Sequence, residues 1–533
     1  MTPVTPGEIT YVPALRQMQA SSAEPLPPAW QEAFARDQIA GKASLADPLP
    51  ERCVARLLAA FIGAGLIFLV LPGTLLGVWN LVNISSQRQS DAISAAWIQA
   101  HGHAQLFGWV ATFMIGISLY AIPKFRGGYI RSLAAGWTMF ALWTAAVALR
   151  WFSGVFAWRW HEIWPASAAV ELIVSVLLLW QATARGPSRR SHELWEILTF
   201  AGLGGLAATL VLQLTVVSRA PAAPAIPAEP DQLFLTTALW IFCFPVVWGF
   251  SARLLPAFLG LKRSASGSGY TGLALLGAGA LLFAAGRGKW AAAATLSAVA
   301  AACWSLRIFH PGERAPKVIG VDPLYPSFVR GAWIWLVLSS LLVFGAPSPG
   351  WLGASRHAFT VGFLAGMIFA IGPRILPAFL NSRELWSVSL MRWSLVLLTT
   401  GCALRVASEP LAYSGIVPWA WSVLPVSASI ELSAVVLFAL NLGKTLATPV
   451  PSWFGREQVK GTMMLYWYVS SYPATKKLLI DAGLATLARI ASVPKTLTLA
   501  DAAAADGASL ETVLSRLGDF FDSRRTRTAR ANS

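Results

Sequence analysis

The amino-acid sequence predicts an all-α integral membrane protein of about twelve transmembrane helices, followed by a small cytoplasmic all-α domain. Hydrophobic residues make up 56% of the 533 residues and charged residues only 12%, whereas a soluble domain carries roughly 25% charged residues. The sequence also contains a series of apolar runs, each close to the ~20 residues that a helix needs to cross a bilayer. These runs lie near 56–82, 96–122, 131–151, 162–183, 195–217, 232–258, 270–286, 290–309, 328–346, 356–380, 391–409 and 416–442.

The net charge of +16 predicts how these helices are oriented. Loops after even-numbered helices are the richer in Lys and Arg, and such loops stay on the cytoplasmic side of a membrane. Both chain ends are therefore expected in the cytoplasm, and the second, sixth and tenth helices are expected to begin at the outer face. Because short loops account for most of the excess charge, we predict a lipid bilayer and no nucleic acid as partner. The basic residues are Lys124, Arg126, Arg131, Arg185, Arg189, Arg190, Lys262, Arg263, Arg307, Arg314, Lys317 and Arg383.

Four segments are expected along the chain. Residues 1–55 are polar and Pro-rich and lack the apolar core of a signal peptide, which predicts a partly disordered cytoplasmic arm. The membrane domain should cover 56–445. Residues 456–523 predict a small cytoplasmic helical domain suited to a protein partner, with Thr498 as a helix N-cap. Residues 524–533 predict a disordered basic tail suited to anionic lipid.

An internal repeat relates the second and tenth helices. His103, Gly108, Pro123 and Phe125 recur as His357, Gly362, Pro377 and Phe379, each 254 residues later. The motif RxLPAF links the sixth helix to the tenth, and Glu171 in the fourth helix matches Glu431 in the twelfth. The simplest architecture is three four-helix units related by an axis along the membrane normal.

The repeat draws attention to histidines, because an ionisable side chain inside a span is a functional candidate. Imidazole is a common axial ligand of haem iron. His103 and His357, at equivalent depth near the outer, periplasmic face, predict one bis-histidine b-type haem. The alternative is a polar helix cap or an interhelical hydrogen bond. His101 lies two residues from His103 and points ~200° away, so we expect it to face a second metal or solvent.

Further polar residues in the spans carry weaker predictions. Arg150 and Arg405 could bind haem propionates, since a guanidinium matches a carboxylate, or could be ordinary interfacial arginines. Glu171 and Glu431 could bond a neighbouring helix or carry protons. Cys243 is a candidate copper(I) ligand because thiolates favour that ion.

Three segments of the membrane domain, HGHAQLFGWVATFMIGISLYAIPKF at 101–125, RHAFTVGF at 356–363 and FVRGAWIWLVLSS at 328–340, resemble the NnrS family of bacterial haem- and copper-containing membrane proteins. The resemblance covers roughly residues 55–445. It implies haem, copper, a location in the bacterial inner membrane, and a role in the response to nitric oxide and nitrosative stress.

The twelve-helix plan also resembles the catalytic subunits of haem–copper oxidases and nitric oxide reductases. In those subunits the second and tenth helices supply the low-spin haem ligands, which His103 and His357 match. Their second metal centre needs several histidines on helices six, seven and ten, and this chain has none on six or seven. That departure argues against a haem–copper reductase in its usual form. The C-terminal segment resembles a small helical domain of iron–sulfur repair proteins, without its cysteine.

Two other functions fit a twelve-helix chain. One is a secondary transporter, although transporters usually have inverted repeats and this repeat looks parallel. The other is a non-catalytic sensor or assembly factor that signals through the C-terminal domain. The sequence leaves open whether the protein is an enzyme.

Overall fold

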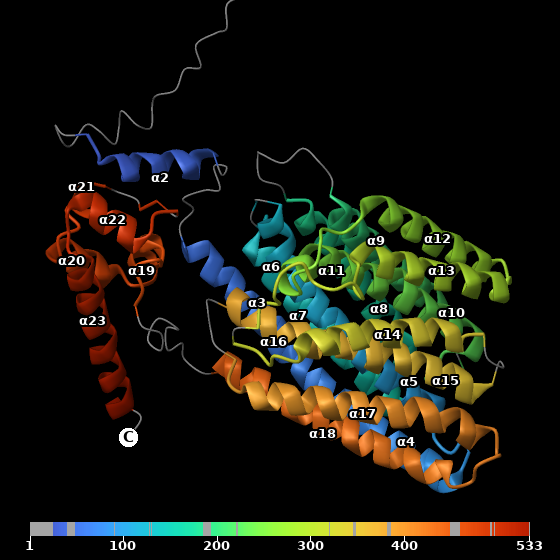
Figure 1. The fold of residues 1–533 in the computed structure, drawn as a ribbon. Coiled ribbons are helices and arrows are strands. Elements are labelled where there is room, and N and C mark those ends of the chain that lie inside the picture. Colours follow the sequence, from blue (N-terminus) through green and yellow to red (C-terminus); the bar gives the residue numbers. More distant parts are fainter. Residues whose placement is uncertain are drawn as a thin grey trace, which may run out of the picture. The chain divides into compact units, whose positions relative to one another are not determined.

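The computed structural model shows two compact parts, which we name the membrane domain and the terminal domain (Figure 1). The membrane domain comprises Glu51–Pro449, and the terminal domain combines Met1–Pro50 with Val450–Ser533. The structure describes residues 25–39, 48–89, 91–126, 128, 130–184, 193–219, 222–318, 320–344, 348–380, 385–447, 459–490, 493–494 and 496–531. The predictions made for Arg185, Arg189, Arg190 and Arg383, and for most of 1–24 and 40–47, lie outside these residues.

The regular secondary structure of the described residues is helical in both domains. Among these residues, the only β-pairing is an isolated bridge between Met464 and Thr498. Ten of the described helices are long and apolar enough to cross a membrane, so the chain is a multi-pass membrane protein. They are Cys53–Gln87, Ala95–Phe125, Leu133–Val155, Trp160–Ala182, Leu194–Val217, Ala228–Phe258, Ser266–Ala284, Pro349–Phe379, Val388–Tyr413 and Ala420–Ala447.

Length and composition alone therefore identify ten of the twelve expected membrane spans. The two remaining predicted spans do form helices, α13 (Gly288–Leu306) and α14 (Tyr325–Leu342). Composition sets them apart, because α13 is rich in small Ala side chains and α14 carries Arg330.

The helices fall into three consecutive four-helix repeats. The first repeat is α3 (Pro48–Phe68) with η1 (Leu69–Leu75) and α4 (Leu76–Gln87), α5 (Ala95–His103) with η2 (Ala104–Ala111) and α6 (Thr112–Phe125), α7 (Leu133–Val155), and α8 (Trp160–Ala182). The second is α9 (Leu194–Val217), α10 (Ala228–Thr236) with η3 (Thr237–Cys243) and α11 (Phe244–Phe258), α12 (Ser266–Ala284), and α13. The third is α14, α15 (Pro349–His357) with η4 (Ala358–Ala365) and α16 (Gly366–Phe379), α17 (Val388–Tyr413), and α18 (Ala420–Ala447).

A shared contact marks the beginning of the third helix in every repeat. The Gln181 side chain of α8 bonds the backbone N–H and C=O of Ser132, the N-cap of α7. The Asn441 side chain of α18 bonds the same two groups of Ser387, the N-cap of α17. In the second repeat, Ser305 of α13 bonds both groups of Ala265, the residue before α12. These contacts satisfy backbone groups that a helix terminus leaves free.

The repeats close into a ring. The last helix of each repeat packs on the first helix of the next, α8 on α9 and α13 on α14, and α18 returns to η1 and α4. Within each repeat the third and fourth helices pair closely, as α12 with α13 and α17 with α18 do in Figure 1. The second helices of the first and third repeats are the most buried spans, at 94% and 78% of their most apolar stretch. Side chains on these two helices are thus the best shielded from lipid.

The terminal domain joins the two ends of the chain. Its helices are α2 (Pro28–Ile39), α19 (Leu465–Ser471), α20 (Pro473–Asp481), α21 (Thr486–Arg489), α22 (Leu499–Asp506) and α23 (Leu510–Ala531). Trp30 of α2 is fully buried in the core of the C-terminal helices and donates from Nε1 to Asp506 (3.0 Å). Thr498 caps α22 as predicted, accepting from Asp501 N–H.

Two consequences follow from this domain. The sequence predicted a separate N-terminal arm, whereas α2 shares a hydrophobic core with residues 465–521. Residues before the first span and after the last one must therefore lie on the same side of the membrane, which requires an even number of crossings.

In addition, α23 extends to Ala531, into the tail predicted to be disordered; residues 532–533 lie outside the described part.

Candidate functional site

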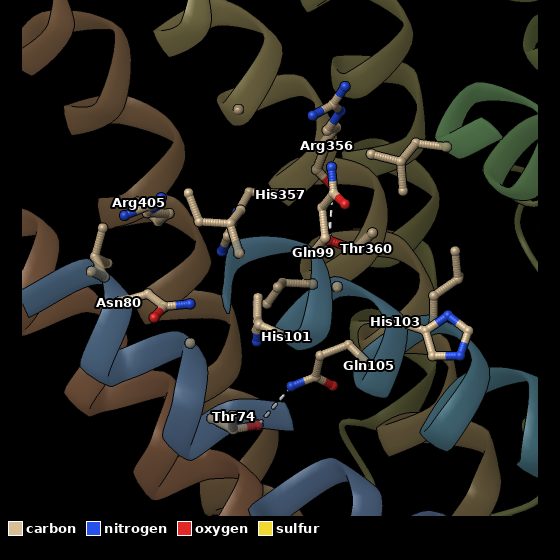
Figure 2. Close-up of a pocket in the computed structure, with 18 of the residues that line it drawn as sticks. Thr74, Asn80, Gln99, His101, His103, Gln105, Arg356, His357, Thr360 and Arg405 are labelled. Atoms are coloured by element: carbon tan, nitrogen blue, oxygen red, sulfur yellow. Dashed lines mark hydrogen bonds between the residues drawn. The ribbon is translucent and has the colours of Figure 1, made fainter. Parts of the chain in front are cut away.

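A cavity of about 550 Å³ lies between the first and third repeats. That volume falls within the range of small-molecule and cofactor pockets, ~300–1,000 Å³. Its walls come from η1, α4, α5, η2, α7, α10, η3, α15, η4, α17 and α18, so the second repeat also contributes. Most of the lining is apolar, with a minority of polar groups that include three histidines and three arginines. Figure 2 shows the three histidines with Arg356 and Arg405. The polar groups are Thr74, Asn80, Gln99, His101, His103, Gln105, Arg150, Asp231, Gln232, Arg356, His357, Thr360, Arg405, Glu409, Tyr413 and Glu431.

The second helix of every repeat changes to a π-helical segment at the same place. Segment η2 begins directly after His103, and η4 directly after His357. By the repeat offset of 121, Thr236 takes the equivalent place in the second repeat, and η3 begins directly after it. π-Helical turns are uncommon and occur frequently at functional sites. The second repeat has the same π-helical segment, but Thr236 places a hydroxyl before it where the other two repeats have an imidazole.

His101 is held by the first helix of its own repeat. Its Nδ1 lies 2.9 Å from the carbonyl oxygen of Gly73. Because a carbonyl can only accept, Nδ1 carries the ring proton, and Nε2 keeps a lone pair that can bind a metal ion. Gly77 lies against the same ring, where a Cβ would come within 2.7 Å of Nδ1. The ionisable groups close enough to act on His101 are His357, Arg405 and Glu431.

His103 leaves the same helix in a different direction (Figure 2). Its ring stacks on Phe107 with centroids 4.9 Å apart, and its Nε2 lies 3.4 Å from Glu171 Oε1. Glu171 also accepts from Ser167 (3.1 Å) and Gln213 (2.8 Å). This pair is enclosed, with side-chain exposures of 6% for His103 and 0% for Glu171.

His357 forms the repeat-equivalent pair on the other side of the cavity. Its Nε2 lies 3.7 Å from Glu431 Oε2, and the two side chains are more open, at 26% and 13% exposed. His103–Glu171 and His357–Glu431 thus have the same local geometry. Because the repeats are arranged in a ring, equivalent residues face different neighbours. Across the cavity, His357 is among the groups that act on His101, whereas those that act on His103 are Glu171 and Arg150.

The arginines line the cavity together with two carboxylates that the sequence did not single out. Arg405 bonds Glu409 Oε1 (3.2 Å), and Arg356 donates to Gln232 Oε1. Asp231 lies close enough to Arg150 and Arg356 to interact with both. Several of these buried atoms have no hydrogen-bond partner among the described residues: Arg150 NH1, Arg405 Nε and NH1, Glu409 Oε2 and Glu431 Oε1. Arg356 and Glu409 could have been noticed as charges at the ends of predicted spans.

A family model for the NnrS protein matches residues 57–450. The chain belongs to the NnrS family. No curated protein matches it in sequence. Among solved structures, it is similar to a chain from the cryo-EM structure of a haem–copper terminal oxidase dimer, with 11% identity and a TM-score of 0.55. That match covers 74% of this chain and 84% of the other. At such low identity the likeness concerns the fold of this NnrS-family chain.

Cys243 and the other described histidines lie away from the cavity of this NnrS-family protein. His161 and His310 are exposed, and His192 falls outside the described residues. Cys243 is the last residue of η3 and is buried in the hydrophobic core. In the described part of the chain, no group of three or more His, Cys, Asp or Glu side chains is arranged to hold a metal ion, so the copper predicted at Cys243 gains no further ligands.

Proposed function

We propose that this chain is a haem-binding protein of the bacterial cytoplasmic membrane that takes part in the response to nitric oxide. In this proposal a b-type haem occupies the 550 Å³ cavity, with His101 and His357 as axial ligands. The observation that carries it is that two imidazoles from different repeats line one largely apolar cavity. The fold supports it, because the similar solved structure is that of a haem–copper terminal oxidase.

The residues of the cavity fit such a group. A ligating histidine usually donates its other ring N–H to a carbonyl or carboxylate, which fixes its tautomer, and His101 does so to Gly73. Arg405 and Arg150 offer buried N–H groups without partners among the described residues, and such groups suit the propionates of haem. A bound haem would supply an iron centre able to exchange an electron, and able to bind a diatomic ligand where one of the two histidines gives way.

The choice of His101 differs from the pair predicted by the repeat, His103 with His357. His103 is stacked on Phe107 and faces Glu171 in an enclosed pocket, whereas His101 has a free Nε2 and His357 as a neighbour. Both histidines line the cavity, so single variants distinguish the two pairings.

The same proposal includes twelve crossings with both ends in the cytoplasm. Helices α13 and α14 occupy the positions that complete the second repeat and open the third, and the terminal domain requires an even number of crossings. The basic loops support the cytoplasmic side. Three repeats of four crossings all start on one side, unlike the inverted repeats usual in transporters.

The test is haem retention in the full-length protein and its His101→Ala, His103→Ala and His357→Ala variants. We expect a Soret band and a pyridine haemochrome of haem b, lost or converted to a high-spin spectrum in His101→Ala and His357→Ala but kept in His103→Ala. Loss in His103→Ala with retention in His101→Ala would restore the repeat-based pair. Full retention in all three, at unchanged monodispersity, would refute a bis-histidine site. Addition of nitric oxide to the reduced protein should shift the Soret band.

A further inference from the structure

The first repeat contains a second, much smaller chamber of about 20 Å³. It lies at the outer part of α5, α7 and α8, and its polar lining is Gln99, His103, Arg150 and Trp164. Gln99, His103 and Arg150 also line the large cavity, so the two spaces share a wall. A space of ~10–15 Å³ is enough for one water molecule if polar partners surround it.

Besides His103 Nε2, which lies 3.4 Å from Glu171 Oε1, three nitrogens on these side chains have no hydrogen-bond partner among the described residues. They are His103 Nδ1, Arg150 NH1 and Trp164 Nε1. All three residues are more than nine-tenths buried, with exposures of 7%, 6% and 4%. A buried polar atom without a partner costs ~1–3 kcal/mol, and native proteins seldom leave several such atoms together.

The hydrogen-bonding capacity of the three nitrogens defines the ligand. Arg150 and Trp164 can only donate. His103 Nε2 faces the Glu171 carboxylate, which places the imidazole proton on Nε2 and leaves Nδ1 as an acceptor. The ligand must therefore accept twice and donate once, and it must be very small.

We propose that this chamber holds one ordered water molecule that bridges Arg150, Trp164 and His103. A halide or another simple anion could accept from Arg150 and Trp164 but could not donate to His103 Nδ1. The local charges also favour a neutral ligand, because Glu171 already balances Arg150. The water ties α5, α7 and α8 together and holds Arg150, which Trp164 also contacts through a cation–π interaction at 4.7 Å, at the wall of the large cavity.

A matched pair of tryptophan variants tests this site in the full-length protein. Trp333 is fully buried, its Nε1 also has no described partner, and it lines neither space. Trp333→Phe removes a donor that has no described partner, whereas Trp164→Phe removes one that the water satisfies. Phe keeps a ring face for the Arg150 cation–π contact and both variants lose similar packing, so Trp164→Phe should have the lower unfolding temperature. An unfolding temperature of Trp164→Phe equal to or above that of Trp333→Phe would overturn the proposal.

Two further measurements do not depend on a variant folding. A cryo-EM map that shows other buried waters should contain a single peak in this chamber, and a map without it would refute the site. Replacing chloride by sulfate in the buffer should leave the unfolding temperature gap between the two variants unchanged, whereas a gap that follows chloride concentration would show an anion instead. Neither outcome requires haem, so failure here leaves the proposed function standing.

Discussion

Gly77→Ala is the substitution that most directly probes His101 as a haem ligand. In the structure, a Cβ on Gly77 would lie 2.7 Å from His101 Nδ1, while ordinary contact begins at 3.4 Å. Cε1 of the ring would lie closer still, so the ring must withdraw by more than about 0.7 Å (3.4 − 2.7). Such a shift stretches the 2.9 Å hydrogen bond from Nδ1 to the Gly73 carbonyl, which fixes the tautomer of the ring.

The expected effect follows from the general sensitivity of metal sites to the partners of their ligands. Disturbing such a partner typically lowers metal affinity by roughly 10–100-fold, which corresponds to about 1.4–2.8 kcal/mol. We expect haem affinity to fall by that factor in Gly77→Ala. Haem titration into the haem-depleted protein, followed in the Soret region, measures it.

Gly63→Ala is the matched control, because Gly63 lies on the same membrane helix and a Cβ there meets nothing within 4 Å. Alanine is the better helix former by ~1 kcal/mol at either site, so neither variant should disturb the helix itself. Equal haem affinity in the two variants would show that His101 is not a ligand held by Gly73 and Gly77.

Two further predictions concern the arginines and the terminal domain. Arg405→Lys keeps the charge but loses the guanidinium fork, and the loss of one hydrogen bond to a charged group costs about 1.5–3 kcal/mol. Haem should therefore transfer to apomyoglobin faster from Arg405→Lys than from the control Arg159→Lys, whose side chain is exposed. An unchanged rate would argue against a contact between Arg405 and a propionate. Trp30→Ala empties a fully buried site in the terminal domain core and should destabilise that domain by about 3–5 kcal/mol. We expect this as faster proteolysis within 459–531. Equal digestion of Trp30→Ala and of Gln31→Ala, a control at an exposed site, would contradict the role of α2.

Much of the membrane domain could be predicted because its signals are local. A run of about 20 apolar residues has few alternatives to a transmembrane helix, and helices occur at all twelve predicted places. The offset of 254 between His103 and His357 appears in the structure as two His–Glu pairs of similar geometry. The offset could not show which groups lie across the ring from each histidine.

The terminal domain illustrates the other limit. Helix α2 and the C-terminal helices are more than 400 residues apart in sequence, and nothing in the local pattern around Trp30 identifies Asp506 as its partner. Thr498, by contrast, was predictable as an N-cap, because a cap involves only residues within one turn.

The sequence by itself thus determined the membrane class, the helix positions, the internal repeat and the small set of histidines and arginines from which any site must be built. Only the tertiary structure placed His101, His103 and His357 around one cavity, and His103 with Glu171 beside a second, smaller chamber. The physical reason is that hydropathy and repeat spacing depend on each helix alone, whereas the rotation of a helix and its neighbours depend on how the whole ring packs.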